Sequence, residues 1–211
     1  MKDLRRFLAE MPLVAILRGL TPEEAPAAMD ALVGAGLRIL EVPLNSPRPL
    51  ESLRLLARRA GDDVLVGAGT VLSVDDVVAV AETGAGLMVA PNCDRPAIEK
   101  AKALGPAALP GVATPSEAFA ALGFGADGLK MFPGEMLPPA VLKAWLAVLP
   151  ARTMLLPVGG VSVDNMGGYF AAGAAGIGIG AALYKPGVSA AELAARADRF
   201  VRRYRELPPI G

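Results

Sequence analysis

Short apolar runs alternate with Ala- and Leu-rich amphipathic stretches along the whole chain. The apolar runs recur at intervals of roughly 20 to 30 residues, about the length that one strand, one helix and two loops occupy. The pattern predicts eight parallel strands joined by crossover helices. The predicted strands are Val14–Gly19, Leu37–Leu44, Leu65–Thr70, Gly86–Pro91, Ala107–Val112, Asp127–Pro133, Leu155–Val161 and Gly176–Gly180.

Helix start and stop signals fall between these runs. Thr21 and Thr114 each precede a proline and then acidic residues, which is the chemistry of an N-cap and a first helical turn. Ser73 and the stretch from Ser162 to Asn165 offer similar caps. Five glycines mark predicted helix ends: Gly34, Gly84, Gly105, Gly123 and Gly173.

Eight βα units with no linker between them predict an α/β protein that forms one domain over residues 1–211. We expect a closed (β/α)₈ TIM barrel with a short extra helix at residues 2–9. An open, doubly wound sheet is the alternative that the periodicity leaves.

The composition narrows the possible partners. The chain is 53% apolar and 20% charged, with 21 basic and 21 acidic residues, which is typical of a globular protein. It has no basic tract that would indicate a nucleic-acid partner, and no apolar run of about 18 residues that would indicate a membrane span. The N-terminal segment lacks a signal-peptide pattern, so we expect a cytoplasmic location.

The chain has no histidine and one cysteine, Cys93. Ser-His and Cys-His nucleophile pairs are thereby excluded, as are nearly all catalytic zinc sites. Acid–base chemistry must fall to Asp, Glu, Lys, Tyr or water.

Ligands of βα-barrels bind at the carboxyl ends of the strands. The residues near those ends are Arg18, Glu41, Asn45, Thr70, Pro91, Asn92, Cys93, Lys130, Gly159, Gly160, Gly180 and Ala181.

Lys130 differs from the other five lysines, which lie in polar or loop contexts. It lies inside an apolar strand, where alternation places it on the inner side with Gly128 and Phe132, while Leu129 and Met131 face the helices. Burial lowers a lysine pKa, and a neutral amine can attack a ketone to form a Schiff base. The alternative is a strand-end lysine whose ammonium reaches water.

Glu41 lies on the predicted second strand, on the side opposite to Leu40 and Val42. A carboxylate there must be paired, hydrated or functional. It is a candidate general acid and base, and the alternative is a structural ion pair with Lys130 or Arg18.

Three further strand ends carry binding chemistry. The guanidinium of Arg18 suits a carboxylate or a phosphate, unless it is only an exposed charge. Thr70, after the Gly67–Gly69 segment, could offer its hydroxyl to a ligand; the alternative is that the segment is only a turn into the next helix. The glycines of the last two strand ends could bind phosphate through backbone N–H groups, although tight turns also need glycine.

The chain resembles the 2-keto-3-deoxy-6-phosphogluconate and -galactonate aldolase family in order over nearly its whole length. The matching stretches are Ala15–Gly19, Leu40–Pro47, Val66–Val71, Ala90–Asn92, Pro110–Pro115, Leu129–Pro133 and Pro157–Val161.

The resemblance implies a class I aldolase without metal or cofactor, usually a homotrimer, that forms pyruvate and D-glyceraldehyde 3-phosphate. It implies that Lys130 forms the Schiff base and that Glu41 moves protons. It implies a substrate carboxylate near Arg18 and Thr70. The remaining substrate-binding residues that we expect are Pro91, Phe132, Val158, Gly159, Gly160, Gly180 and Ala181.

Pro43, Asn45 and Val158 resemble the galactonate-type branch, whose substrate is 2-dehydro-3-deoxy-6-phosphogalactonate; the gluconate C4 epimer is the alternative substrate. Ala181 stands where family members often carry serine. Two other classes of function stay open: a non-catalytic barrel that binds a phosphorylated ligand, and a metal-dependent aldolase or isomerase.

Overall fold

The computed structural model describes residues 3–208, and strands alternate with helices throughout. The strands are β1 (Leu13–Ile16), β2 (Ile39–Pro43), β3 (Leu65–Gly69), β4 (Leu87–Val89), β5 (Ala107–Leu109), β6 (Gly111–Val112), β7 (Leu129–Met131), β8 (Leu155–Pro157) and β9 (Ile177–Ile179). The helices are α1 (Leu4–Glu10), α2 (Ala25–Gly34), α3 (Pro49–Arg59), α4 (Val74–Ala81), α5 (Arg95–Leu104), α6 (Pro115–Gly123), α7 (Pro139–Leu146), α8 (Met166–Ala171) and α9 (Ala190–Arg205), with the 3₁₀ turn η1 (Gly134–Met136).

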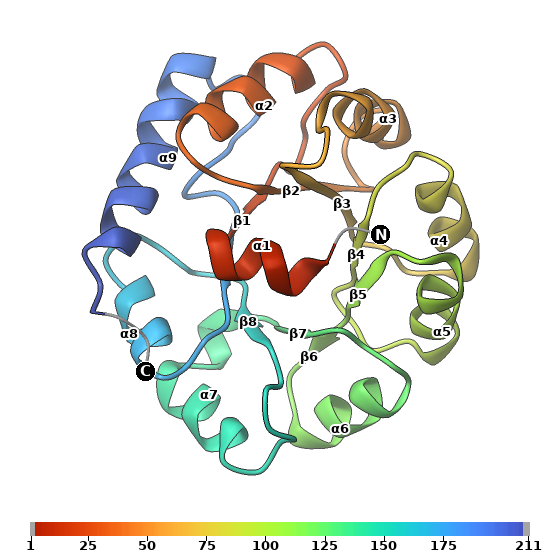
Figure 1. Ribbon diagram of the computed structural model, residues 1–211, viewed down its shortest axis with the longest axis vertical. Helices are drawn as coiled ribbons and strands as arrows, with labels where there is room; N and C mark the ends of the chain where they lie inside the picture. Colours follow the sequence, from red (N-terminus) through yellow and green to blue (C-terminus); the bar gives the residue numbers. More distant parts are fainter. Residues whose placement is uncertain (1–2, 209–211) are drawn as a thin grey trace.

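The strands form two parallel sheets. One has the order β5-β4-β3-β2-β1-β9, and the other has the order β6-β7-β8. The strands lie around a common centre with the helices outside them (Figure 1). The protein is therefore an α/β fold with parallel sheets, as the alternating pattern predicts.

The two sheets approach each other at both pairs of edge strands, β5 with β6 and β8 with β9. Pro110 alone separates β5 from β6, and an isolated parallel bridge joins Val158, after β8, to Gly178 of β9. Each predicted strand run overlaps an observed strand, although β1 begins one residue before its run, at Leu13, and the run Ala107–Val112 is two strands instead of one. The division falls at Pro110 because proline has no N–H to donate to a strand ladder.

The predicted caps are correct at Ser73 and Thr114, which both form capping boxes. At Thr21 the predicted helix start is wrong, because α2 begins only at Ala25 and residues 22–24 form a turn, but Thr21 Oγ1 does accept the N–H of Glu24 at 3.4 Å as a cap would. In that turn the Glu24 carboxylate accepts hydrogen bonds from the backbone N–H and the hydroxyl of Thr21.

The two faces of the strands belong to different packing clusters. Leu40 and Met131 pack in the large cluster that includes the helices. Ile39 and Leu87 pack in a second cluster with Phe7 of α1. Figure 1 shows α1 lying across the ring of strands, so the inner face is covered at that end by this helix. The predicted extra helix at residues 2–9 is thus α1, although residue 2 lies outside the described residues.

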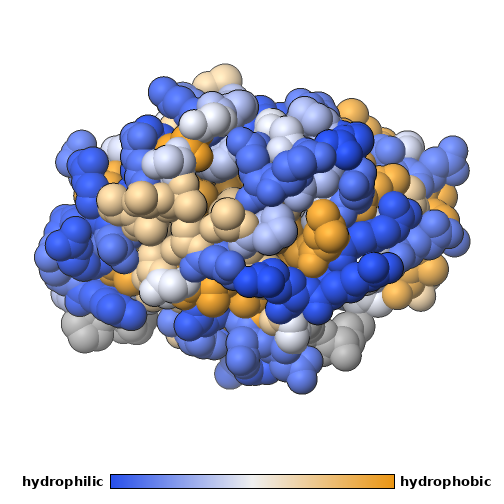
Figure 2. Space-filling view, turned by 90° about the horizontal axis from the view of Figure 1, so that it is seen from above, coloured by the Kyte–Doolittle hydropathy of each residue, from blue (hydrophilic) through white to orange (hydrophobic). Residues whose placement is uncertain are grey.

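Polar side chains cover most of the face in Figure 2, with apolar patches between them. The large apolar side chains that are exposed are Leu55, Leu72, Val74, Leu104, Phe119, Met136 and Val148. None of the helices described between residues 3 and 208 has both the length and the apolar character needed to cross a membrane.

Candidate active site

Glu41 and Lys130 are the only charged residues that are buried in the described part of the chain. Their exposed fractions are 2% and 6%. On β2, Glu41 has the orientation opposite to Leu40 and Val42, and on β7, Lys130 has the orientation opposite to its neighbours, which pack in the helix-facing cluster. Both side chains therefore face the inner side of the strands, as the alternation predicts.

The backbones that carry these two residues are paired on both sides. Glu41 is in register with Ile16 of β1 and Gly67 of β3. Lys130 is in register with Gly111 of β6 and Leu156 of β8. Residues in the middle of a sheet have little freedom to move, so the two side chains start from fixed positions.

The Glu41 carboxylate occupies the space above Gly69. A Cβ atom added to Gly69 would overlap Oε1 of Glu41. The absence of a side chain at Gly69 therefore makes room for a carboxylate of the protein itself.

Burial perturbs both ionisable groups. It raises the pKa of Glu41 to about 7, against the opposing effect of the Lys130 and Arg18 charges. Burial also lowers the pKa of Lys130; the Glu41 charge opposes this shift and the Arg18 charge adds to it. A carboxyl group that titrates near neutral pH and an amine that loses its proton readily are suited to proton transfer and nucleophilic attack.

Neither side chain forms an ion pair or a hydrogen bond within residues 3–208 that would give it a purely structural role. Within residues 3–208, Glu41 makes no ion pair, and its Oε2 atom has no hydrogen-bond partner. The Nζ atom of Lys130 lies 4.6 Å from the centroid of the Phe132 ring, and the side chain is buried instead of reaching water. The geometry favours the functional interpretation of both residues over the structural alternatives.

Arg18 follows β1 and bonds to the loop after β2. Its Nη1 donates to Oδ1 of Asn45 at 2.7 Å, and the N–H of Gly19 donates to Oγ of Ser46 at 2.9 Å. Asn45 and Ser46 therefore hold the loop that presents Arg18. The sequence indicated Asn45 as a strand-end residue and as a mark of one family branch, but not as the partner of the arginine.

A cleft of about 580 Å³ brings together seven of the predicted site residues. They are Arg18, Phe132, Val158, Gly159, Gly160, Gly180 and Ala181. The cleft is large enough for a phosphorylated six-carbon acid, since ligand sites usually measure about 300–1,000 Å³.

Backbone N–H groups at the cleft are free to bind an anion. Gly160 has a φ of 63°, in the left-handed region that glycine adopts without strain. Within the part of the chain described, the N–H groups of Gly160, Val161, Ala181 and Ala182 donate to no protein acceptor. Two short loops thus present unpaired donors to one space.

Thr70 and Pro91 do not line this cleft. Thr70 directly follows Gly69 and has a φ of 56°, a strained value for a β-branched residue. Pro91 lines a neighbouring cleft of about 500 Å³, which shares Phe132 with the first one. Seven of the predicted site residues therefore line the first cleft, and Pro91 lines the second together with Phe132. Glu41, Thr70 and Lys130 line neither cleft.

Of the cleft residues that were not predicted, three have ionisable side chains: Glu135 on η1, and Tyr184 and Lys185 after β9. Glu135 comes two residues after the end of a predicted strand run, which is a signal that could have indicated it. Lys185 was grouped with the lysines in polar or loop contexts. Tyr184 gives no signal in the sequence, because its position depends on how the last loop folds.

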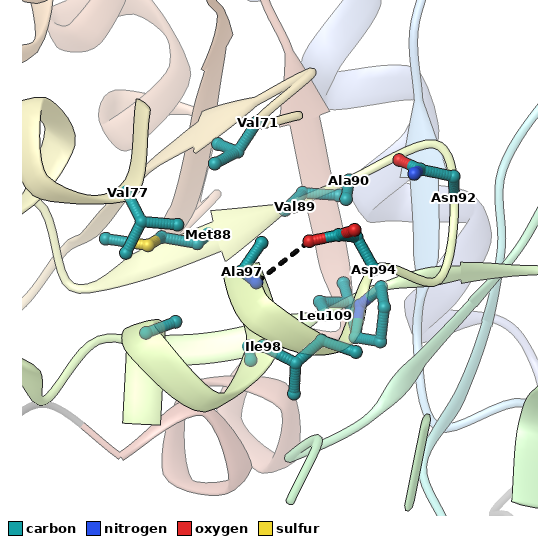
Figure 3. A pocket seen from close by; sticks show the side chains of 13 residues that line it. Val71, Val77, Met88, Val89, Ala90, Asn92, Asp94, Ala97, Ile98 and Leu109 are labelled. Carbon is teal, nitrogen blue, oxygen red and sulfur yellow. Dashed lines mark hydrogen bonds between the residues drawn. The ribbon is translucent and has the colours of Figure 1, made fainter. Parts of the chain in front are cut away.

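A smaller cavity of about 20 Å³ lies outside the site, among β4, α4 and α5. Figure 3 shows its mainly apolar lining, including Val77, Met88 and Ile98. Asp94 at its edge accepts a hydrogen bond from the N–H of Ala97 and caps α5. A space that holds about one water molecule cannot admit a sugar acid.

No group of three or more Cys, Asp and Glu side chains is placed to hold a metal ion within residues 3–208.

Comparisons with known proteins identify related sequences and a related structure. The sequence model of the KDPG and KHG aldolases matches residues 4–198. The chain is 44% identical to the 2-dehydro-3-deoxy-6-phosphogalactonate aldolase of Escherichia coli (strain K12), over 95% of this chain and 98% of that one. It is 46% identical to a probable enzyme of the same name from Rhizobium meliloti (strain 1021), over 92% of each. A solved native KDPGal structure superposes with a TM-score of 0.91 and 44% identity, covering 93% of this chain and 96% of the other. The chain belongs to the KDPG and KHG aldolase family.

Proposed function

We propose that this aldolase cleaves 2-dehydro-3-deoxy-6-phosphogalactonate into pyruvate and D-glyceraldehyde 3-phosphate through a Schiff base on Lys130. The observation that carries the proposal is the burial of one lysine and one carboxyl group on the inner face of the strands. Burial raises the pKa of Glu41 and lowers the pKa of Lys130, so it favours the neutral form of each group.

The reaction begins with the neutral amine of Lys130. Its nitrogen attacks the C2 ketone to form a carbinolamine, and loss of water gives a protonated imine. Glu41 supplies the proton that turns the C2 hydroxyl into a leaving water. With its pKa at about 7, Glu41 can both give and accept a proton near neutral pH.

The protonated imine then accepts the electrons of the C3–C4 bond. A base removes the proton of the C4 hydroxyl, the bond breaks, and C4 leaves as the aldehyde carbon of D-glyceraldehyde 3-phosphate. The remaining enamine takes a proton at C3, and water releases pyruvate and free Lys130. The electron sink is the imine, so the sequence of steps needs neither a metal nor a cofactor.

The other site residues bind the substrate in this proposal. Arg18 and Thr70 bind the substrate carboxylate, and Pro91 and Phe132 line the space around the imine. The phosphate lies at the backbone N–H groups of the loops that contain the remaining binding residues, which are Gly159, Gly160, Gly180 and Ala181.

Val158 supports the galactonate epimer as the substrate. It lines the cleft and is mostly buried, and a valine cannot donate a hydrogen bond to the C4 hydroxyl as a threonine could. The relatives with 44–46% identity also have galactonate in their names. The gluconate epimer is the alternative substrate, and it would be cleaved by the same steps.

We also propose that the two sheets form one closed (β/α)₈ barrel, and that residues 1–211 form one domain. The contacts at Pro110 and between Val158 and Gly178 support closure, and the large cluster of buried residues extends from Met11 to Val201. A homotrimer would cover part of the exposed apolar side chains, and sedimentation equilibrium should then give the mass of three chains. The cytoplasmic location stays a prediction.

Borohydride trapping tests the central step. Incubation with pyruvate and borohydride should attach one reduced pyruvyl group per chain, and peptide mapping should locate it on Lys130. Lys130→Arg should give no adduct and no turnover, because a guanidinium stays protonated. An adduct on another lysine, or no adduct, would contradict the assignment and favour a barrel that only binds a phosphorylated ligand.

A further inference from the structure

The cleft proposed for the phosphate contains few charged side chains. They are Arg18, Glu135 and Lys185, and the carboxylate of Glu135 lies against the Gly159–Gly160 loop. A phosphate group carries nearly two negative charges at neutral pH, and Glu135 would repel it. A cation beside the backbone N–H groups would offset this repulsion and strengthen the binding of the anion.

Arg18 is already engaged elsewhere. Its guanidinium bonds to Asn45, and its charge acts on Glu41 and Lys130 at the reacting end of the site. Lys185 is not among the charges that shift those two groups. Lys185 lines the same cleft as Gly180 and Ala181, the residues proposed to bind the phosphate.

The residues on either side of Lys185 are anchored. The Tyr184 hydroxyl donates to Oε2 of Glu24 at 3.3 Å, and Tyr184 is 4% exposed. Burial and the Glu24 charge raise the pKa of Tyr184 to about 12, so the hydroxyl keeps its proton. Pro186 packs over Gly19, where an added Cβ would lie 2.6 Å from Cγ of the proline.

The Lys185 side chain itself has no polar partner among the described residues. Among residues 3–208 it makes no hydrogen bond and no ion pair, and the side chain is exposed at the cleft. The turn before it is closed by bonds from Leu183 and Tyr184 to the carbonyl oxygen of Gly180, at 2.8 and 3.0 Å. The backbone of this turn is thus fixed, and the free Lys185 side chain lines the same cleft as Ala181 and Ala182.

We propose that Lys185 binds the phosphate of the substrate and makes the enzyme selective for phosphorylated over unphosphorylated aldehydes. The inference rests on the proposed function, because it assumes that the cleft takes the phosphate end of the substrate. Ala181 has no hydroxyl to donate, and the ammonium of Lys185 supplies the charged donor on the same turn.

The test compares two aldehydes in the synthetic direction. With pyruvate as the donor, Lys185→Gln should lower kcat/KM for D-glyceraldehyde 3-phosphate roughly 10- to 100-fold, which is the usual weight of a hydrogen bond to a charged group. Most of the loss should appear in KM. The kcat/KM for D-glyceraldehyde should stay within twofold, and Lys185→Arg should recover most of the selectivity.

Lys143→Gln is the matched control, because Lys143 is exposed on α7 and does not line the cleft. Binding of inorganic phosphate, measured by ³¹P line broadening, should weaken in Lys185→Gln but not in Lys143→Gln. Equal losses for both aldehydes, or an unchanged preference and unchanged phosphate binding, would overturn the proposal. Failure of the proposed function is recognised separately, because wild-type enzyme would then give no borohydride adduct with pyruvate.

Discussion

The clearest single perturbation of the site is Gly69→Ala, which adds one methyl group to β3. That methyl would occupy the position of Oε1 of Glu41. The strand cannot move away easily, because Gly69 is paired with Pro43 and its carbonyl accepts the N–H of Leu44 at 2.8 Å. The carboxylate of Glu41 must therefore leave its place.

The size of the effect follows from the role proposed for Glu41. A displaced general acid and base should lower kcat by about 10²- to 10⁴-fold, as if the carboxylate had been removed. An extra methyl group in a packed interior also costs about 1–3 kcal/mol of the free energy of unfolding. Most domains have about 5–15 kcal/mol, so the variant should still fold.

The assay is steady-state cleavage of the phosphorylated acid, together with urea unfolding to measure stability. Gly67→Ala is the matched control, because Gly67 lies on the same strand as Gly69. Its added methyl would approach Cβ of Leu87 on β4 at 2.7 Å, and not the Glu41 carboxylate. We expect Gly67→Ala to lose stability and to keep its turnover per folded molecule.

A second measurement separates Glu41 from other causes. In a Glu41→Ala background the carboxylate is gone, so adding Gly69→Ala should cost little further activity. A Gly69→Ala enzyme within threefold of wild type would refute the reasoning. An equal loss in the Glu41→Ala background would also refute it.

Four further measurements test the proposed chemistry and substrate. Glu41→Gln should keep the fold and lose about 10²- to 10⁴-fold in turnover. The pKa of Glu41 in the folded protein, about 7, lies above its ordinary value of 4.5. The protonated carboxyl group therefore contributes to the free energy of unfolding in full below about pH 4.5, and this contribution is lost as the pH rises through 7. Urea unfolding should then show wild type losing about 3 kcal/mol more than Glu41→Gln over that range, and parallel curves would contradict the shift. Activity should be unchanged by extensive chelator treatment, whereas a loss restored by a divalent ion would favour metal-dependent chemistry. Wild type should prefer the galactonate epimer, and Val158→Thr should raise relative kcat/KM on the gluconate epimer roughly two- to twelvefold; faster wild-type cleavage of the gluconate epimer would contradict the substrate assignment.

The strand pattern was predictable from the sequence because it depends on local alternation. Each apolar run overlaps a strand, and the alternation correctly orients Lys130 and Glu41 to the inner face. The strand ends and the division at Pro110 were less predictable. They depend on which N–H groups find partners on a neighbouring strand, and a single sequence does not contain that information.

The candidate site was predictable where residues at the strand ends carry unusual chemistry for their surroundings. Lys130 was identified because it interrupts an apolar strand. The space above Gly69 and the bond between Tyr184 and Glu24 were not predictable, because each joins residues that are distant in the chain. Lys185 was passed over because a lysine in a loop is ordinarily only a solvated charge.

A chain without histidine must obtain a group that titrates near neutral pH in another way. Here burial raises the pKa of Glu41 and lowers that of Lys130, and the mutual attraction of their charges opposes both shifts. The positive charge of Arg18 lowers both pKa values, so it favours an ionised Glu41 beside a neutral Lys130, the combination that a base and a nucleophile require. In the proposed reaction the substrate carboxylate would partly neutralise Arg18, which weakens its effect and raises the pKa of Glu41 again. Binding would then turn Glu41 towards its acid form at the stage when the carbinolamine needs a proton to lose water.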